Sequence, residues 1–271
     1  MYRGKIIAVG GECVSTDGSS EDGLMTPNEE AQDTPRHRSI YLLPNLLTTA
    51  ALFSGFYAIV AAMKGNFEQA AVAIFIAMIM DTLDGRVARL TKTQSAFGAQ
   101  YDSLSDMVSF GLTPALVVYR WALEPLGKIG WIASFIYAAA TALRLARFNI
   151  QTATDKRYFL GLPCPAAAAV LAGLVWLDTE YPGTLNLGQH FLKLVIALLT
   201  LTLGLLMVSN IRYYSFKEVD FKGHVPFVVV LVGVLLMGVI AYEPPLILFL
   251  GFMLYALTGP VMWCRSWIKK G

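Results

Sequence analysis

The chain has 271 residues, of which 56% are hydrophobic and 15% are charged, whereas soluble domains contain about 25% charged residues. The apolar residues are grouped in long blocks, which excludes disordered, collagen-like and outer-membrane barrel proteins. The formal net charge of +2 is too small to indicate a nucleic-acid partner. The composition therefore predicts an all-α integral membrane protein.

The order of polar and apolar segments predicts a tail followed by a membrane domain. Residues 1–38 are polar and show no apolar periodicity, so we expect a disordered cytoplasmic tail. In residues 39–271, apolar stretches of about twenty residues follow one another, which is the length that an α-helix needs to cross a ~30 Å hydrocarbon core. We expect about eight transmembrane helices, over residues 41–62, 67–89, 97–121, 129–150, 163–178, 191–210, 223–242 and 244–264.

The basic residues of the predicted loops indicate the orientation in the membrane. All but four of the 21 Lys and Arg residues fall on the side of the N-terminus; the exceptions are Lys64, Arg120, Lys128 and Lys193. Short cytoplasmic loops are enriched in Lys and Arg. We therefore expect a multi-pass protein of the cell (inner) membrane with both termini in the cytoplasm.

Four aspartates lie at adjoining ends of the second and third predicted helices, where an unpaired charge costs about 2.5–3.5 kcal/mol. Asp81 and Asp84 are three residues apart and Asp102 and Asp106 are four apart, so each pair lies on one helix face. The short connection between the helices places the two pairs opposite each other. Four convergent carboxylates suit two divalent cations, Mg²⁺ or Mn²⁺, as in two-metal phosphoryl-transfer sites.

The core motif, residues 81–106, resembles the signature of the CDP-alcohol phosphotransferase family, D-x-x-D-G-x-x-A-R-x8-G-x-x-x-D-x-x-x-D. Every fixed residue of the signature is present at the family's spacing: Asp81, Asp84, Gly85, Ala88, Arg89, Gly98, Asp102 and Asp106. The resemblance implies the family's membrane fold and a reaction that joins a CDP-linked group to an alcohol at a dimetal site facing the cytoplasm.

The resemblance also implies a substrate pair and an assembly. Stretches that begin at Pro44, Ser105, Arg144, Phe159 and Ser209 are similar to members of the family that use L-serine as the acceptor. The phosphatidyl group of CDP-diacylglycerol would then pass to the serine hydroxyl, giving phosphatidylserine and CMP. The family further implies a homodimer that is surrounded by membrane lipid.

Single residues receive roles from the same resemblance. Asp81 and Asp102 would bridge the two cations, Asp84 would complete the first site, and Asp106 would complete the second and act as the catalytic base. The residues expected to bind CDP-diacylglycerol are Asn45, Gly85, Arg89 and Ser95. The aspartates, Gly85 and Arg89 are fixed positions of the family motif, Ser95 matches a position that contacts the nucleotide or diphosphate in relatives, and Asn45 lies where the first helix would close over the nucleotide.

Serine recognition falls outside the shared motif, and four basic residues are candidates for binding its carboxylate. Arg144 and Arg147 lie three residues apart near the end of the fourth predicted helix, and Arg212 and Lys217 follow the sixth. A guanidinium can bind a carboxylate through two parallel hydrogen bonds. The alternative is that all four residues are anchors on the cytoplasmic side.

Other interpretations are open at this point. The aspartates could be interfacial acids paired with Arg86, Arg89 and Lys92. The acceptor could be glycerol 3-phosphate or an inositol phosphate, which would require further cations in the pocket. In a different class, the protein could be a cation transporter, because carboxylates within the membrane often mark ion pathways. A transporter would distribute its acids over several helices, whereas these aspartates gather at one end of two neighbours.

Overall fold

The computed structural model describes residues 35–91, 93, 95–150, 158–182, 190–214 and 227–268. From Arg36 onward these residues belong to one compact unit. Most of the predicted tail, residues 1–34, lies outside the described residues, and so do Lys92, Lys217 and the side chain of Arg212.

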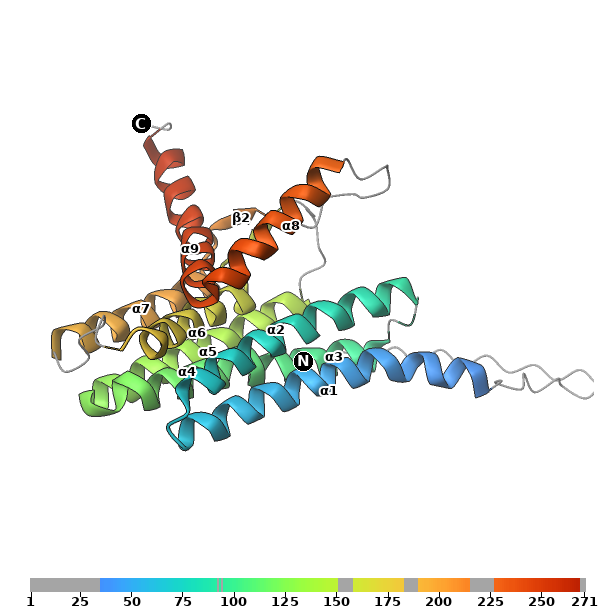
Figure 1. The fold of residues 1–271 in the computed structure, drawn as a ribbon, viewed down its shortest axis with the longest axis horizontal. Helices are drawn as coiled ribbons and strands as arrows, with labels where there is room; N and C mark the ends of the chain where they lie inside the picture. The colour runs from blue at the N-terminus through green and yellow to red at the C-terminus, as the bar shows by residue number, and fades with distance from the viewer. Residues whose placement is uncertain are drawn as a thin grey trace, which may run out of the picture. The chain divides into compact units, whose positions relative to one another are not determined.

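Helices make up most of the described chain (Figure 1). The elements in chain order are α1 (Pro35–Met63), α2 (Phe67–Leu90), α3 (Ala96–Asp106), η1 (Met107–Leu112), α4 (Thr113–Val118), η2 (Tyr119–Leu123), η3 (Glu124–Leu126), α5 (Lys128–Ile150), β1 (Tyr158–Leu160), α6 (Cys164–Glu180), α7 (His190–Val208), β2 (Arg212–Tyr214), α8 (Phe227–Tyr242) and α9 (Pro244–Ile268). Of the η segments, η1 and η2 are π-helical and η3 is a 3₁₀ turn.

Two predicted spans differ most from the observed helices. The first begins at Pro35 instead of residue 41, because proline at the first helical position fits the helical φ angle. The third is broken into α3, η1, α4 and η2 instead of being one α-helix. Pro114 has no backbone N–H to donate, and its ring would clash with the carbonyl one turn earlier in a regular α-helix. The wider π-helical turn that precedes it avoids this clash.

Four of the described helices are long and apolar enough to cross a membrane. These segments are Leu43–Met63, Lys128–Ile150, His190–Val208 and Pro244–Trp263. They confirm the prediction of a helical membrane protein. The charged residues of α2 and the 17-residue length of α6 keep these two helices out of that set, and the count of eight spans stays a prediction.

The alanine-rich helix α6 forms the centre of the core. Every residue from Ala166 to Val175 is buried, and the helix packs against α2 on one side and α9 on another. A Cβ atom on Gly173 would lie 3.0 Å from the Cα atom of Phe249 in α9. Small residues let the backbones approach closely, which is how helices associate in a lipid environment that offers little hydrophobic driving force.

A short antiparallel ladder, which the all-α prediction missed, joins β1 to β2 after α5 and α7. Leu160 pairs with Arg212, and Phe159 pairs with Tyr213. The Tyr213 hydroxyl donates a 3.0 Å hydrogen bond to the carbonyl of Ala256 in α9. Burial raises the pKa of Tyr213 to about 12, so the phenol stays protonated and keeps this bond.

Helix α1 is held against the broken third helix by a row of hydroxyl groups. Each hydroxyl donates to a backbone carbonyl of α1: Ser105 to Thr48 (3.1 Å), Ser109 to Ala51 (3.2 Å) and Thr113 to Gly55 (3.1 Å). The donors are four residues apart, so they lie on one face of the helical segment. This register places Thr48 beside the end of α2 that carries the aspartates.

Candidate functional site

The predicted carboxylate cluster lies between the second half of α2 and the second half of α3, on the two sides of a short turn. The last turn of α2 closes with the N–H of Thr91, which donates to the carbonyl of Val87 at 2.9 Å. Ser95 caps α3, because its Oγ accepts a 2.9 Å hydrogen bond from the N–H of Gly98. The connection between these two caps is short, so the chain reverses and the acidic segments of both helices come side by side.

Three aspartates from the two helices converge on one point. Asp81 of α2 and Asp102 and Asp106 of α3 each offer one carboxylate oxygen, and the three oxygens lie within 4.8 Å of one another. Hard cations such as Mg²⁺ bind oxygen ligands of this kind. The structure therefore brings together three of the four predicted metal ligands in a group that could hold a cation.

The hydrogen bonding and charge of the cluster fit a divalent metal. Atom Oδ1 of Asp102 is buried and has no hydrogen-bond partner, although buried polar atoms are nearly always paired. In the part of the chain that the structure describes, the only ion pair joins Arg120 to Glu124. Neither Arg86 nor Arg89 neutralises the aspartates, so ion pairing with these two residues does not explain the cluster.

Asp84, the fourth predicted ligand, is held differently from the other three. The residue is 4% exposed, and its Oδ2 accepts a 2.7 Å hydrogen bond from the hydroxyl of Thr48 in α1. It lies within electrostatic range of Asp81, Asp102 and Asp106. The hydrogen bond from Thr48 thus fixes one oxygen of Asp84 at the edge of the cluster.

Sequence reasoning missed Thr48 as the partner of Asp84. The two residues belong to different helices, and only the register in which α1 packs on α2 and α3 brings them together. The sequence did contain a signal for this hydrogen bond. Thr48 carries a hydroxyl within an apolar span, near the membrane depth of an acidic residue on a neighbouring helix.

Replacing Thr48 with valine is expected to destabilise the protein and the site. The change keeps the shape of the side chain but leaves Asp84 buried without its donor, which costs about 1.5–3 kcal/mol for a hydrogen bond to a charged group. Thermal unfolding in detergent measures this loss. Thr202→Val in α7 is the control, because the exposed Thr202 donates only to the carbonyl of Leu198. Equal unfolding temperatures for the two variants would contradict the role of Thr48.

The residues predicted to bind the CDP group form two pairs. Asn45 and Ser95 meet at the start of α3, since a Cβ atom on Gly98 would lie 3.5 Å from Asn45 Oδ1 and 3.1 Å from Ser95 Oγ. In α2, the Nε of the exposed Arg89 donates to the carbonyl of Gly85 at 2.8 Å. The space that a Cβ atom on Gly85 would occupy is open, so a ligand can approach the backbone there.

The two described arginines among the serine candidates have different surroundings. Arg144 donates from Nη1 to Sγ of Cys164 in α6 at 3.0 Å, and its buried Nε has no partner. Cys164 lies within electrostatic range of both Arg144 and Asp106.

Arg147 instead donates hydrogen bonds at the C-terminal end of α7. Its Nη1 donates to the carbonyl of Val208 at 3.4 Å, and its Nη2 donates to Oδ1 of Asn210 at 2.7 Å. A cation at a helix C-terminus satisfies unpaired carbonyls and interacts favourably with the helix dipole. Packing therefore gives different hydrogen-bond partners to two arginines whose spacing in the sequence suggested one shared role.

The comparisons with known proteins agree with this site. A family described as CDP-alcohol phosphatidyltransferase matches residues 41–264. A protein of Helicobacter pylori named CDP-diacylglycerol–serine O-phosphatidyltransferase is 40% identical over 236 residues, 85% of this chain and 94% of the relative. A protein of Methanocaldococcus jannaschii with the same name is 35% identical, over 67% of this chain and 78% of the relative. The archaetidylserine synthase of Methanothermobacter thermautotrophicus is 32% identical, over 65% and 70%.

Proposed function

The chain belongs to the CDP-alcohol phosphatidyltransferase family, and we propose that it transfers the phosphatidyl group of CDP-diacylglycerol to the hydroxyl of L-serine. The products are phosphatidylserine and CMP. The observation that carries this proposal is the convergence of Asp81, Asp102 and Asp106 without a compensating cation in the described chain. The names of the relatives support L-serine as the acceptor.

In this proposal, Asp81, Asp84, Asp102 and Asp106 hold two divalent cations, Mg²⁺ or Mn²⁺. Such ions, when bound, neutralise the diphosphate and stabilise both the attacking and the leaving oxygen of an in-line displacement. The unpaired Oδ1 of Asp102 supports this assignment. Thr48 keeps Asp84 in place by donating to one of its oxygens.

The proposed transfer forms one P–O bond and breaks another. The serine hydroxyl oxygen bonds to the phosphorus that carries diacylglycerol, and the bond from that phosphorus to the CMP oxygen breaks, so CMP leaves with the electron pair. Asp106 accepts the proton of the serine hydroxyl. A carboxylate is a weak base for an alcohol, so the proton moves as the new P–O bond forms.

The two residue pairs beside the cluster are proposed to bind the nucleotide and the diphosphate. The open backbone at Gly85 lets a phosphate approach, and the exposed guanidinium of Arg89 supplies a positive charge next to it. Asn45 and Ser95 lie at the N-terminus of α3, where backbone N–H groups favour anionic ligands. This arrangement holds the reacting phosphorus close to the aspartates.

Arg144 is the proposed partner of the serine carboxylate. Its buried Nε is a donor without an acceptor, and the neighbouring Cys164 lies within electrostatic range of the proposed base. A buried unpaired donor is unfavourable unless a ligand satisfies it. Arg147, which already donates to the end of α7, is not expected to contact serine.

The proposal extends to the membrane arrangement. Eight helical stretches, the third interrupted by π-helical turns, cross the cell membrane with both termini in the cytoplasm. This topology rests on the distribution of Lys and Arg between the loops. A homodimer is proposed from the family resemblance alone.

An assay of CMP release tests the proposed function. Purified protein in detergent is supplied with CDP-diacylglycerol, Mg²⁺ or Mn²⁺, and one acceptor at a time: L-serine, glycerol 3-phosphate or myo-inositol phosphate. We expect CMP and phosphatidylserine with L-serine, and no turnover in excess EDTA. Preference for another acceptor would overturn the choice of serine. Absence of CMP with every acceptor would overturn the transferase proposal and favour the transporter interpretation.

A further inference from the structure

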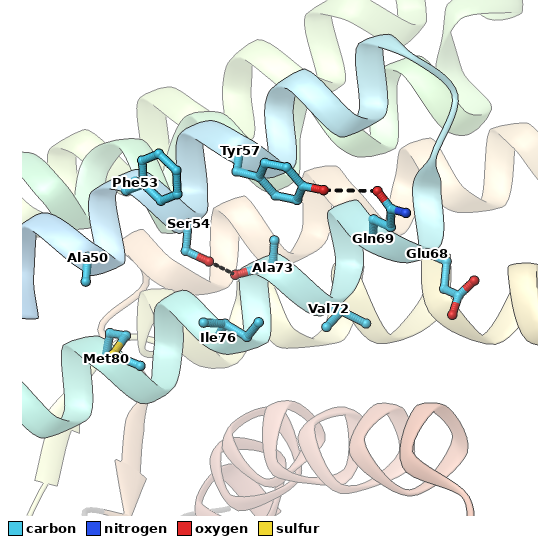
Figure 2. Close-up of a pocket in the computed structure, with 10 residues that line it drawn as sticks. All are labelled: Ala50, Phe53, Ser54, Tyr57, Glu68, Gln69, Val72, Ala73, Ile76 and Met80. Atoms are coloured by element: carbon cyan, nitrogen blue, oxygen red, sulfur yellow. Dashed lines mark hydrogen bonds between the residues drawn. The ribbon is translucent and has the colours of Figure 1, made fainter.

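Polar side chains between the helices are mostly paired within the protein. Between α1 and α2, the hydroxyl of Ser54 donates to the carbonyl of Ala73 at 2.7 Å, and the hydroxyl of Tyr57 donates to Oε1 of Gln69 at 3.0 Å (Figure 2). Among the described residues, three buried side-chain atoms have no hydrogen-bond partner: Oδ1 of Asp102, Oγ of Ser134 and Nε of Arg144. Arg144 is the only cation of the three, so the contacts that hold it determine what it can bind.

Arg144 is oriented by a neutral group on the neighbouring helix α6. Its Nη1 donates to Sγ of Cys164 at 3.0 Å. Over the residues that the structure describes, no carboxylate forms an ion pair with Arg144. A thiol sulfur is a weak hydrogen-bond acceptor without a formal charge, so it orients the guanidinium without neutralising it. The positive charge of Arg144 therefore stays available to an anionic ligand.

The position of Cys164 is fixed by the segment that leads into α6. Gly161 has a φ angle of 78°, and a Cβ atom there would lie 2.2 Å from the carbonyl oxygen of Met207, so the backbone passes where no side chain fits. The N–H of Leu162 donates to the carbonyl of Leu206 in α7 at 3.0 Å. Cys164 follows as the fully buried first residue of α6. Its thiol therefore has little freedom to move away from the guanidinium.

We propose that Cys164 is a positioning residue for the acceptor: its thiol holds the Arg144 guanidinium in the orientation that binds the carboxylate of L-serine. This inference rests on the proposed function for the acceptor and for the role of Arg144. Cys164 lies within electrostatic range of Asp106, the proposed base. An arginine that is ordered before its ligand arrives loses less conformational entropy when the ligand binds. The thiol is therefore expected to act on the affinity for serine and not on the chemical step.

The chemical type of the side chain at position 164 matters as much as its place. A carboxylate there would form an ion pair with Arg144 and would compete with the carboxylate of serine for the same guanidinium. An apolar side chain would accept no hydrogen bond and would leave the long arginine side chain free to adopt other rotamers. The thiol of Cys164 avoids both effects, because it accepts a hydrogen bond and carries no competing charge.

Removing the thiol should weaken serine binding selectively. Cys164→Ala is expected to raise the KM for serine about threefold to tenfold, because the freed arginine must be ordered again on binding. The kcat and the KM for CDP-diacylglycerol should stay within about twofold of wild type. Cys164→Ser retains a neutral acceptor and should lie closer to wild type than Cys164→Ala. Ser134→Ala is the matched control, because it removes a buried Oγ on α5 that has no hydrogen-bond partner, and it should leave the KM for serine unchanged.

A double variant tests whether Cys164 acts through Arg144. When Cys164→Ala is added to Arg144→Ala, the KM for serine should change by less than about twofold, whereas independent contributions would multiply. Cys164→Asp keeps an acceptor beside the guanidinium but neutralises it, so the KM for serine should rise about tenfold or more. The unfolding temperature of each variant in detergent identifies the folded ones. If Cys164→Ala is unfolded, Cys164→Ser and Cys164→Asp provide the comparison.

The wild-type protein and the variants test different statements. A wild type that releases no CMP with serine would overturn the acceptor in the proposed function, and the role of Cys164 would be lost with it. If the wild type uses serine, an unchanged serine KM in folded Cys164→Ala, or equal changes in both KM values, would overturn the positioning role alone. Multiplied effects in the double variant would also overturn it, because Cys164 would then act independently of Arg144.

Discussion

Asp106→Asn is expected to lower turnover by about a thousandfold or more, because general-base catalysis contributes about 10²–10⁴-fold to a rate. Asparagine has nearly the same size as aspartate but cannot accept the serine proton. Binding of CDP-diacylglycerol should be largely retained, since the other three aspartates still carry their charges. Single-turnover CMP release and equilibrium binding of the donor, measured on the same preparation, separate the two effects.

Asp81→Asn should behave differently from Asp106→Asn. Asp81 is the only residue from α2 among the three whose oxygens converge, and the family resemblance implies that it would help to hold both cations, so its loss should weaken donor binding as well as turnover. Asp178→Asn is a control in α6, where the carboxylate accepts a 3.0 Å hydrogen bond from Trp121. Near-normal kcat in Asp106→Asn would show that another group accepts the proton.

The helices and the carboxylate cluster were predictable because their signals are local. Apolar stretches of membrane-spanning length marked the helical segments, and aspartates three and four residues apart must share a helix face. The short connection between Leu90 and Ala96 then left only an antiparallel arrangement of the two helices. Asp81, Asp102 and Asp106 converge as that reasoning predicted.

The features that sequence reasoning missed depend on contacts between distant segments. The ladder of β1 and β2 pairs segments that α6 and α7 separate, and each strand alone is too short to give an alternating pattern. The hydroxyl groups of Ser105 and Ser109 look like ordinary helix residues until their acceptors on α1 are known. The π-helical turns could be suspected from Pro114, but their position follows from packing.

The serine candidates show the same limit at the level of single residues. Arg144 and Arg147 are three residues apart on α5, so their spacing predicts one shared role. Packing gives them different neighbours, Cys164 of α6 for Arg144 and the end of α7 for Arg147. This difference turns one hypothesis about a pair into two separate predictions.

Arg144→Ala is expected to raise the KM for serine about tenfold to a hundredfold, since a hydrogen bond between charged groups contributes about 1.5–3 kcal/mol. The KM for CDP-diacylglycerol should change by less than twofold, because the donor binds through other residues. Arg144→Lys should recover part of the loss by restoring the positive charge without the bidentate geometry. Initial rates at varied serine and fixed saturating donor, and then the reverse, give both constants.

Arg147→Ala is the matched variant on the same helix. It removes the donors to Val208 and Asn210, so it should lower the unfolding temperature while leaving the KM for serine within about twofold, as expected for a cation that caps a helix end. A selective rise in the serine KM of Arg147→Ala, with Arg144→Ala unchanged, would reverse the assignment. The carboxylate of serine would then bind at the end of α7, and the unpaired Nε of Arg144 would require another acceptor.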